Sequence, residues 1–257
     1  MATWTPGALA SEARRLAGRC WRVVEAQHVV STMKVVDTLA EQSRLEELLE
    51  RTKPRVPPDC RHLHYLLSTP FRYGAPYPRG SRFRRAGMTP GVFYASQAVT
   101  TAIAEMAFAR LLFFADSPAT PWPANPTEHT AFQARFHASA GLDLTVAPFD
   151  GARARLTHAT DYETCQALAE AAREAGVQAI RYRSARDPEG GVNVALLTCA
   201  AFSATAPLER QTWRLHFDSG GVRALCEIPP RRLSFDTAAF ARDSRIGAVR
   251  WERPPAV

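Results

Sequence analysis

The amino-acid sequence predicts a mixed α+β fold of short strands with flanking helices, preceded by a helical N-terminal extension. Three observations support this fold class: an ordinary globular composition over 257 residues, many short apolar runs, and two capping boxes. With 46% hydrophobic and 22% charged residues, the chain can bury a sizeable core. The apolar runs do not follow the regular strand–helix alternation of a doubly wound fold.

The first 58 residues are expected to be mostly helical. Across residues 19–52 several apolar side chains are spaced for one helix face, and Ser43 and Glu46 form a capping box that restarts the helix. The proline-rich stretch KPRVPP then ends it. We therefore predict a helical extension over residues 1–58 and a second unit over residues 59–257.

The second unit is predicted to hold two helices among many strands. One helix spans 98–114 and is capped by Ser96, and the other spans 161–175 and begins at a capping box of Thr160 and Glu163. The expected strands are short apolar runs between turn residues. They cover residues 64–73, 91–96, 130–138, 142–147, 177–182, 192–198, 212–217, 221–228 and 232–236.

The charge of the chain leaves two interpretations open. The formal net charge is +7, and 30 of the 32 basic residues are arginine. A genome rich in G and C would favour arginine codons, whereas recognition of phosphate would favour the bidentate guanidinium fork. A nucleic-acid surface is a rival explanation. However, the basic residues form no continuous helical stripe, and no zinc-finger or RNP-type motif occurs.

Cysteine content and hydropathy indicate a cytoplasmic protein. The five cysteines are an odd number without a C-x-x-C pair, which favours reduced thiols over a disulfide framework or a zinc site. No apolar run approaches the roughly 18 residues of a membrane span. The N-terminal stretch MATWTPGALASEARRLAG lacks the apolar region of a signal peptide.

A single acid stands within an arginine-rich stretch. Residues 71–115 contain six arginines and one carboxylate, Glu105. In the predicted helix, Glu105 shares a face with Phe108 and Leu112, so it lies in an apolar stripe. Two interpretations stay open: an acid at the edge of a helix face that pairs with a nearby arginine, or a buried, oriented carboxylate with a functional role.

Other candidates surround this helix in the sequence. Arg82 and Arg84 follow a Gly/Pro loop and precede a strand, where they could form a phosphate clamp, although single arginines are usually solvated. Tyr94 ends a strand, a position more typical of core residues. Ser184 lies between arginines after another strand, where a serine is usually a turn residue.

In their order, these residues resemble the RES-domain family, which is named for its Arg, Glu and Ser. The matching stretches are STPFRY, GSRFR, GVFYAS, TAIAEMAFAR and IRYRSAR…GGVNVALL, and WRVVEAQHVVST looks like the helical lead-in of longer members. The resemblance covers about residues 63–198. It implies an ADP-ribosyltransferase-like core over 63–198 within a RES domain of residues 59–257, with C-terminal strands over 199–257.

The resemblance implies a role for each candidate. The family's arginine falls on Arg82, with Arg84 as the alternative because extra residues separate this motif from the next strand. Its tyrosine, glutamate and serine fall on Tyr94, Glu105 and Ser184. The implied catalytic residues are Glu105, Tyr94 and Arg82. The residues implied in NAD binding, without a metal, are Arg72, Arg82, Arg84, Tyr94, Ser96 and Ser184.

Family members consume NAD or transfer ADP-ribose from it, and they are typically toxins of bacterial toxin–antitoxin pairs. Cleavage of the nicotinamide–ribose bond passes through an oxocarbenium-like state. Arginines would hold the pyrophosphate, a tyrosine would pack the cationic ring, and one carboxylate would stabilise the ribosyl cation. The resemblance thus implies an NAD glycohydrolase or phosphorylase. Its implied partner is a cognate Xre-type antitoxin, through which alone it would contact nucleic acid, and a homodimer is left open.

Two other functions stay open at this point. The first is an ADP-ribosyltransferase that modifies a host protein, since the acceptor side is built from loops. The second, from another class, is a non-catalytic basic module that binds RNA or DNA. Such binding would weaken steeply with salt, whereas NAD turnover would not. A RES-like scaffold without activity is disfavoured because the Arg, Tyr, Glu and Ser are all present.

Overall fold

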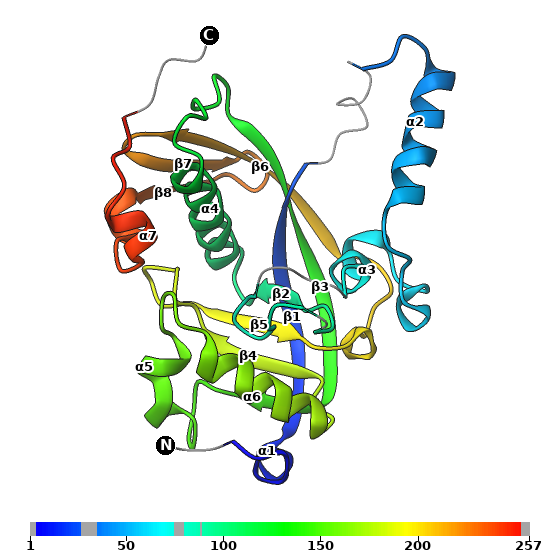
Figure 1. Cartoon of the computed structure of the whole chain (residues 1–257), viewed down its shortest axis with the longest axis vertical. Coiled ribbons are helices and arrows are strands. Elements are labelled where there is room, and N and C mark those ends of the chain that lie inside the picture. The colour runs from blue at the N-terminus through cyan, green and yellow to red at the C-terminus, as the bar shows by residue number, and fades with distance from the viewer. Residues whose placement is uncertain (1–3, 27–34, 75–79, 88, 253–257) are drawn as a thin grey trace.

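The structure is a computed structural model that describes residues 4–26, 35–74, 80–87 and 89–252. It confirms a mixed α+β fold (Figure 1). Its strands are β1 (Arg14–Glu25), β2 (Phe93–Ser96), β3 (Thr127–Asp143), β4 (Ala179–Arg183), β5 (Val192–Leu196), β6 (Glu209–Asp218), β7 (Gly221–Cys226) and β8 (Arg231–Asp236). Its α-helices are α1 (Pro6–Glu12), α2 (Leu39–Thr52), α3 (Tyr65–Arg72), α4 (Val99–Asp116), α5 (Arg153–Leu156), α6 (Glu163–Glu174) and α7 (Ser244–Gly247).

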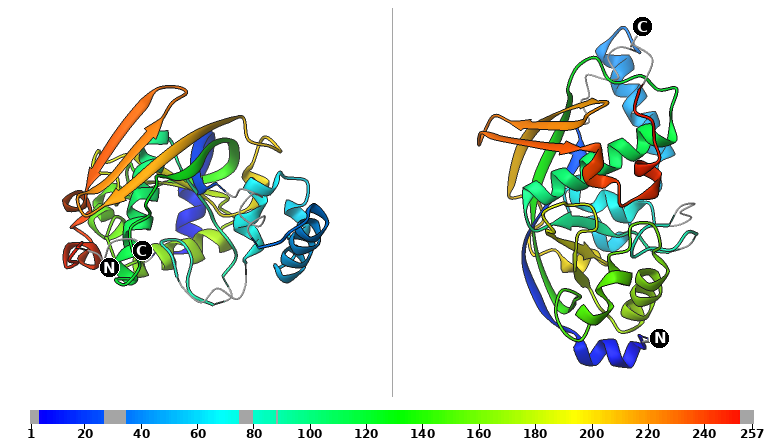
Figure 2. Two further views of the ribbon diagram at one scale, coloured as in Figure 1. Left: turned by 90° about the horizontal axis from the view of Figure 1, so that it is seen from above. Right: turned by 90° about the vertical axis from the view of Figure 1, so that its left-hand side faces the viewer.

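The eight strands form one sheet in the order β1-β2-β5-β4-β3-β6-β7-β8, and β1 also pairs with β3. The first five strands of this order therefore close on themselves, while β6, β7 and β8 extend from β3 as an antiparallel ribbon (Figure 2). All pairings are antiparallel except that of β3 with β4. Closure removes the free edges of the five strands and leaves their inner faces to the core.

Strand β1 corrects the prediction of helix from residue 19 onward. Residues 14–25 are extended and pair with β3 along most of their length, from Leu16 with Ala138 to Glu25 with His129. Trp21 and Val23 are buried in one core cluster, and Cys20 is buried in another. Successive side chains of a strand point to opposite faces, which explains the two clusters. Residues 27–34 of the predicted helix lie outside the described part of the chain.

Part of the N-terminal prediction is confirmed, because α2 is helical. Its capping box is formed by Thr38 and Glu41 rather than by Ser43 and Glu46. Only Gln42 of this helix is buried, and the helix stands at the edge of the molecule in Figure 1. The division of the chain at residue 58 stays a prediction.

Other elements depart from prediction in detail. The stretch around Pro70 was expected to be a strand and forms α3, in which Pro70 lies within the helix. The two strands expected at 130–138 and 142–147 are one strand, β3, which ends at Asp143. Neither Ser96 nor Thr160 caps a helix, since α4 and α6 begin without a side-chain cap. For Ser96 a tertiary contact outweighs the local pattern, because its hydroxyl donates to Asn193 instead of capping the helix.

Three core clusters hold these elements together. One lies between α6 and strands β4 and β5, and a second lies between α4 and strands β1, β6 and β7. The third lies between α3 and strands of the closed sheet. Helix α4 is thus buried along most of its length, although no described helix is both long and apolar enough to cross a membrane.

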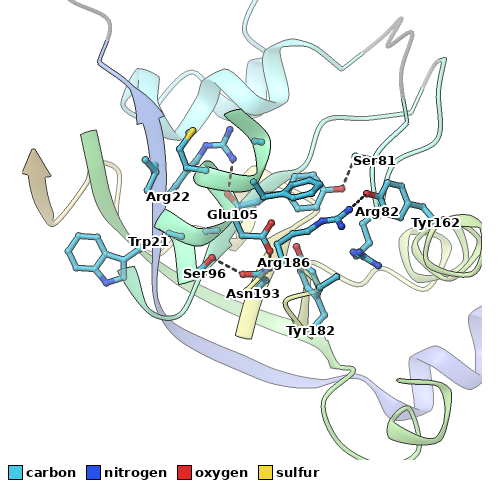
Figure 3. Close-up of a pocket in the computed structure, with 18 residues that line it drawn as sticks. Trp21, Arg22, Ser81, Arg82, Ser96, Glu105, Tyr162, Tyr182, Arg186 and Asn193 are labelled. Carbon is cyan, nitrogen blue, oxygen red and sulfur yellow. Dashed lines mark hydrogen bonds between the residues drawn. The ribbon is translucent and has the colours of Figure 1, made fainter. Parts of the chain in front are cut away.

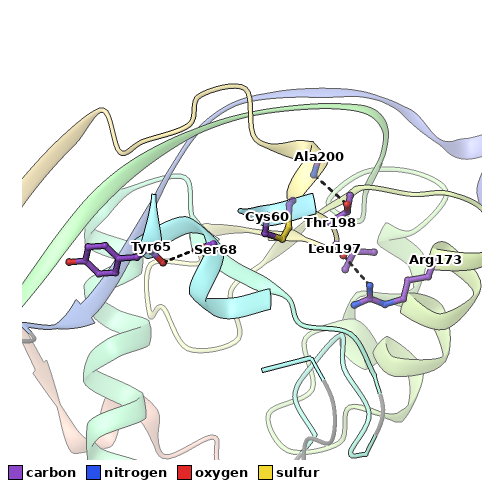
Figure 4. Close-up of a disulfide and its surroundings, with 8 residues drawn as sticks. Cys60, Tyr65, Ser68, Arg173, Leu197, Thr198 and Ala200 are labelled. Carbon is purple, nitrogen blue, oxygen red and sulfur yellow. Dashed lines mark hydrogen bonds between the residues drawn. A yellow bond between two sulfur atoms is a disulfide. The ribbon is translucent and has the colours of Figure 1, made fainter. Parts of the chain in front are cut away.

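A disulfide corrects the expectation that all cysteines are reduced. Cys60 and Cys199 are 139 residues apart in the sequence, yet they are bonded to each other with a Cα–Cα distance of 5.5 Å (Figure 4). Both lie in the third core cluster, where they tie the segment before α3 to the segment after β5. The other cysteines (Cys20, Cys165 and Cys226) are free and buried.

Candidate functional site

A pocket of about 330 Å³ lies among β1, β2, β4, β5 and α4 (Figure 3). Apolar side chains of β1 and α4, including Trp21, Met106 and Phe108, form part of its lining. The polar lining residues come from segments far apart in the sequence. They are Arg22, Ser81, Arg82, Tyr94, Ser96, Glu105, Tyr162, Tyr182, Arg186 and Asn193.

Glu105 projects from α4 into this pocket and is half-buried. Its Oε1 accepts hydrogen bonds from Ser184 Oγ at 2.7 Å and from Asn193 Nδ2 at 2.6 Å. Ser96 Oγ donates in turn to Asn193 Oδ1 at 2.7 Å. Glu105 Oε2 accepts no hydrogen bond from any described residue. The carboxylate is therefore fixed through one oxygen and can offer the other to a ligand.

The turn after β4 brings Ser184 to Glu105. Ser184 Oγ accepts hydrogen bonds from the backbone N–H groups of Arg186 and Asp187, at 3.0 and 2.9 Å, and donates its own proton to Glu105. The same loop is held against α4, because Asp187 Oδ2 accepts from Thr101 Oγ1 at 2.7 Å. A Cβ at Gly191 would collide with both of those side chains, so this close approach requires glycine.

Tyr94 also lines the pocket and orients the turn that precedes β2. Its hydroxyl accepts from the Phe83 N–H at 3.0 Å and shares a hydrogen bond with Ser81 Oγ at 2.9 Å. Burial raises the pKa of Tyr94 to about 12, and these hydrogen bonds only partly oppose the shift. Tyr94 is thus a neutral aromatic wall at physiological pH.

Arg82 lines the pocket, but its guanidinium is largely occupied. Its Nη1 donates to the Leu156 carbonyl at 2.8 Å and its Nη2 to the His158 carbonyl at 2.9 Å. The guanidinium also lies 4.9 Å from the ring centroid of Tyr162. Arg82 therefore fixes the α5 side of the pocket, and it reaches the pocket surface with few free donors.

The other two predicted arginines do not line the pocket. Arg84 donates to the carbonyls of Thr89 at 3.0 Å, Gly74 at 2.8 Å and Tyr73. These hydrogen bonds hold together the loop before β2. Arg72 pairs with Glu50 of α2 at 2.6 Å. Of the three arginines implied in NAD binding, only Arg82 lines the pocket, so the predicted clamp of Arg82 and Arg84 is not formed there. Arg79, another arginine of this stretch, lies outside the described residues.

The cation that the sequence reasoning missed is Arg22, on β1. Its Nη1 donates to the Tyr94 carbonyl at 2.7 Å, while Nε and Nη2 have no hydrogen-bond partner among the described residues. Burial lowers the pKa of Arg22 to about 10, which leaves it charged at neutral pH. Arg22 and Glu105 line the same pocket without forming an ion pair, so both charges face a potential ligand.

Sequence reasoning also missed Asn193, Tyr162, Tyr182 and Arg186. Asn193 had a usable signal, since a buried amide within the strand sequence VNVAL needs partners. Tyr182 is directly opposite Asn193 in the sheet, and burial, together with the charge of Glu105, raises its pKa well above the usual value. No group of His, Cys, Asp and Glu side chains in the described ranges is arranged to hold a metal ion.

Comparisons with known proteins identify the family of the chain but do not bear on individual site residues. No curated protein matches the chain. Among solved structures, a chain of the M. tuberculosis MbcT–MbcA toxin–antitoxin complex matches with 13% identity and a TM-score of 0.45, covering 91% of this chain and 96% of that one. The family model of the RES domain matches residues 54–218, which are more than half of the sequence. The chain therefore belongs to the RES domain family.

Proposed function

We propose that this protein cleaves the bond between nicotinamide and ribose in NAD. The observation that supports this most directly is the geometry of Glu105, whose Oε1 is held by Ser184 and Asn193 while Oε2 is left for a ligand. A carboxylate fixed in this way does not have to reorganise when positive charge develops beside it. A ribosyl cation is the transition-state charge that one such group can stabilise.

The remaining side chains of the pocket suit the rest of NAD. Arg22 has donors that no described residue occupies and that can bind a phosphate oxygen, and guanidinium–phosphate hydrogen bonds are among the strongest in proteins. The ring of Tyr94 offers a neutral aromatic face to the cationic nicotinamide. Apolar residues of α4 and β1 exclude water from part of the pocket, which strengthens both contacts. In this assignment Arg22 takes the role that the sequence analysis assigned to Arg72 and Arg84.

The proposed step needs no redox partner. The C1′–N1 bond of the nicotinamide riboside breaks, and its electron pair returns to the ring nitrogen, so neutral nicotinamide leaves. Water adds to C1′ and releases a proton, which gives ADP-ribose; inorganic phosphate as the nucleophile would give the 1-phosphate instead. Glu105 Oε2 would lie beside C1′ and stabilise the cation between these events.

As a member of its family, the protein is further proposed to be the toxin of a toxin–antitoxin pair, with a core related to the ADP-ribosyltransferase toxins. Loss of NAD would stop the metabolism of the cell that makes the protein. A cognate inhibitor that covers the pocket would prevent this. The positive charge of Arg22 in the pocket favours an inhibitor that offers carboxylates to it.

The direct test is to incubate the purified chain with NAD and to measure free nicotinamide by chromatography. We expect release that depends on Glu105 and changes little between about 50 and 200 mM salt. Tight binding of RNA or DNA that weakens steeply over this salt range, without nicotinamide release, would instead support the nucleic-acid module. Labelled ADP-ribose attached to a protein would support transfer to a host protein.

The toxin assignment has its own test in cells. Expression of the wild-type chain is expected to arrest growth and to deplete NAD, and Glu105→Gln is expected to relieve both effects. Harmless expression of folded wild-type protein would contradict it. Co-expression with a cognate antitoxin, to be sought in the neighbouring open reading frame, should restore growth, and that antitoxin should compete with NAD for the pocket in vitro.

A further inference from the structure

A buried carboxylate, Asp243, lies directly behind the pocket. It belongs to the C-terminal segment, which here means residues 237–252, after β8. Asp243 is fully buried (0% exposed), although it lies beyond residue 218, where the match to the family ends. Its Oδ2 lies 2.9 Å from Arg186 Nη1 and 2.7 Å from Arg245 Nη2, and its Oδ1 accepts from Arg245 Nε at 3.0 Å. Burial of a carboxylate is unfavourable unless it is paired in this way.

Arg186 connects this carboxylate to the pocket wall. Its guanidinium lies 3.8 Å from the ring centroid of Phe108, and its Nη2 donates to the Tyr162 hydroxyl at 3.0 Å and to the Ala159 carbonyl. Arg186, Phe108 and Tyr162 all line the pocket, as Figure 3 shows for Arg186 and Tyr162. Arg186 is itself 6% exposed, so its charge depends on Asp243 for compensation.

The same arginine is also connected to Glu105 through its backbone. The N–H groups of Arg186 and Asp187 donate to Ser184 Oγ, and Ser184 Oγ donates to Glu105 Oε1 at 2.7 Å. A displacement of the Arg186 side chain would therefore act on the turn that fixes the carboxylate of Glu105. Asp243 is thus connected to Glu105 through Arg186 and Ser184.

Apolar packing attaches the C-terminal segment to the body. Phe240 packs on Phe108 with ring centroids 5.8 Å apart, and Ile246 of α7 is buried in the core cluster of α4. The carboxylate takes no part in these apolar contacts. What Asp243 adds is a cap for α7, since its Oδ1 accepts from the Arg245 backbone N–H at 3.0 Å, and the ion pair with Arg186 and with Arg245. Arg245 is 42% exposed and could remain charged without a partner.

We propose that Asp243 is a positioning residue of the pocket, which holds Arg186 so that Tyr162 and the Ser184 turn keep the orientation required for turnover. Asp243 does not line the pocket itself, so it would act through Arg186. The role is specific to this segment, which lies outside the matched family region. The kinetic test of this proposal rests on the proposed NAD cleavage, whereas its hydrogen-exchange test does not.

The test compares two variants in the full-length chain. Asp243→Asn keeps the shape and removes the charge, whereas Ile246→Ala loosens the same segment by deleting buried apolar atoms. For each we would measure kcat and KM for nicotinamide release per folded molecule, at a temperature where thermal unfolding shows both to be native. Asp243→Asn is expected to lower kcat/KM by roughly tenfold to a hundredfold, the scale of a small misplacement in an active site. Ile246→Ala should retain wild-type kinetics.

A second measurement does not require activity. Hydrogen exchange of the backbone amides of Arg186 and Asp187 should be about tenfold or more faster in Asp243→Asn than in Ile246→Ala, because local opening frees these donors. If the wild-type chain releases no nicotinamide, the proposed function fails, and the exchange rates still decide the role of Asp243.

Two results would overturn the proposal. The first is wild-type kinetics together with wild-type hydrogen exchange in Asp243→Asn. The second is a decrease in kcat/KM and an increase in exchange rate that are as large in Ile246→Ala as in Asp243→Asn. Should Asp243→Asn be too unstable to purify, the double variant Arg186→Gln/Asp243→Asn removes both buried charges together and is expected to fold. Wild-type kinetics and exchange in that double variant would likewise contradict the role of the pair.

Discussion

The two sides of the pocket are built in different ways. On the side of β2, α4 and β5, short hydrogen bonds between side chains connect Ser96, Asn193, Glu105 and Ser184 into one network. On the side of β1, Arg22 makes one hydrogen bond to a backbone carbonyl and keeps its other donors free of partners among the described residues. The first side is preorganised and holds a negative charge; the second presents a positive charge that a ligand can pair.

The arginine-rich loop before β2 differs from both. Its two buried arginines, Arg82 and Arg84, bond mainly to backbone carbonyls. Carbonyl groups in a loop without regular structure need donors, and a guanidinium with five N–H groups can satisfy several at once. A high density of arginine therefore supports the loop, and it does not by itself mark the phosphate site.

The largest effect should come from the preorganised side. Glu105→Gln removes the negative charge and retains the shape, so we expect turnover to fall by roughly two to three orders of magnitude, as for loss of one preorganised electrostatic group. Nicotinamide release under saturating NAD measures this. Glu174→Gln, at an exposed position of α6, is the control and should behave as wild type. Wild-type turnover by the Glu105→Gln protein would remove the basis for the proposed mechanism.

The positive side is tested next. Arg22→Gln should raise KM or Kd for NAD by about tenfold to a hundredfold, because a charged hydrogen bond contributes about 1.5–3 kcal/mol. Arg19→Gln provides a matched control on the same strand, since Arg19 does not line the pocket and its only side-chain hydrogen bond among the described residues is to Gln133. Calorimetric titration with NAD would show the difference. Equal affinities for the two variants would mean that the phosphates bind elsewhere.

The loop arginines should affect stability more than affinity. Arg84→Lys loses the fork that bridges several carbonyls, and we expect unfolding free energy to decrease by about 1–3 kcal/mol with little change in KM. Arg82→Lys should cost a similar amount of stability and, because Arg82 reaches the pocket, weaken NAD binding as well. Denaturant unfolding and steady-state kinetics separate the two quantities. A KM effect of Arg84→Lys larger than that of Arg82→Lys would contradict this division.

The smallest effect is expected at Tyr94. Tyr94→Phe keeps the ring and deletes the hydroxyl, so we expect a loss of about 1 kcal/mol of stability and nearly unchanged turnover at neutral pH. The folded pKa of about 12 exceeds the usual value of 10.0. Between these values the folded state binds more protons than the unfolded state, so wild-type stability falls as pH rises from about 10 to about 12. In Tyr94→Phe this part of the alkaline decrease should disappear, as thermal unfolding across that range would show.

Much of this protein follows from local patterns in its sequence. Periodicity and turn residues correctly predicted the α+β class, helices α4 and α6, and most strands after residue 90, because those elements are each locally consistent. Of the predicted face of Glu105, Phe108 and Leu112, the first two line the pocket together, since a 3.6-residue period fixes which side chains share a helix face. The order of Arg, Tyr, Glu and Ser sufficed to identify the family, which the domain match confirms.

Which basic side chains reach the pocket, by contrast, depends on tertiary structure. The helical pattern predicted from residue 19 onward is overridden, and residues 14–25 become β1 because pairing with β3 closes the sheet. That closure brings Arg22 to the pocket, while Arg72 and Arg84 are used elsewhere. Asp243 reaches Arg186 from a distant part of the chain for the same reason. A long-range ion pair depends on how elements pack, and local sequence patterns contain no information about that partner.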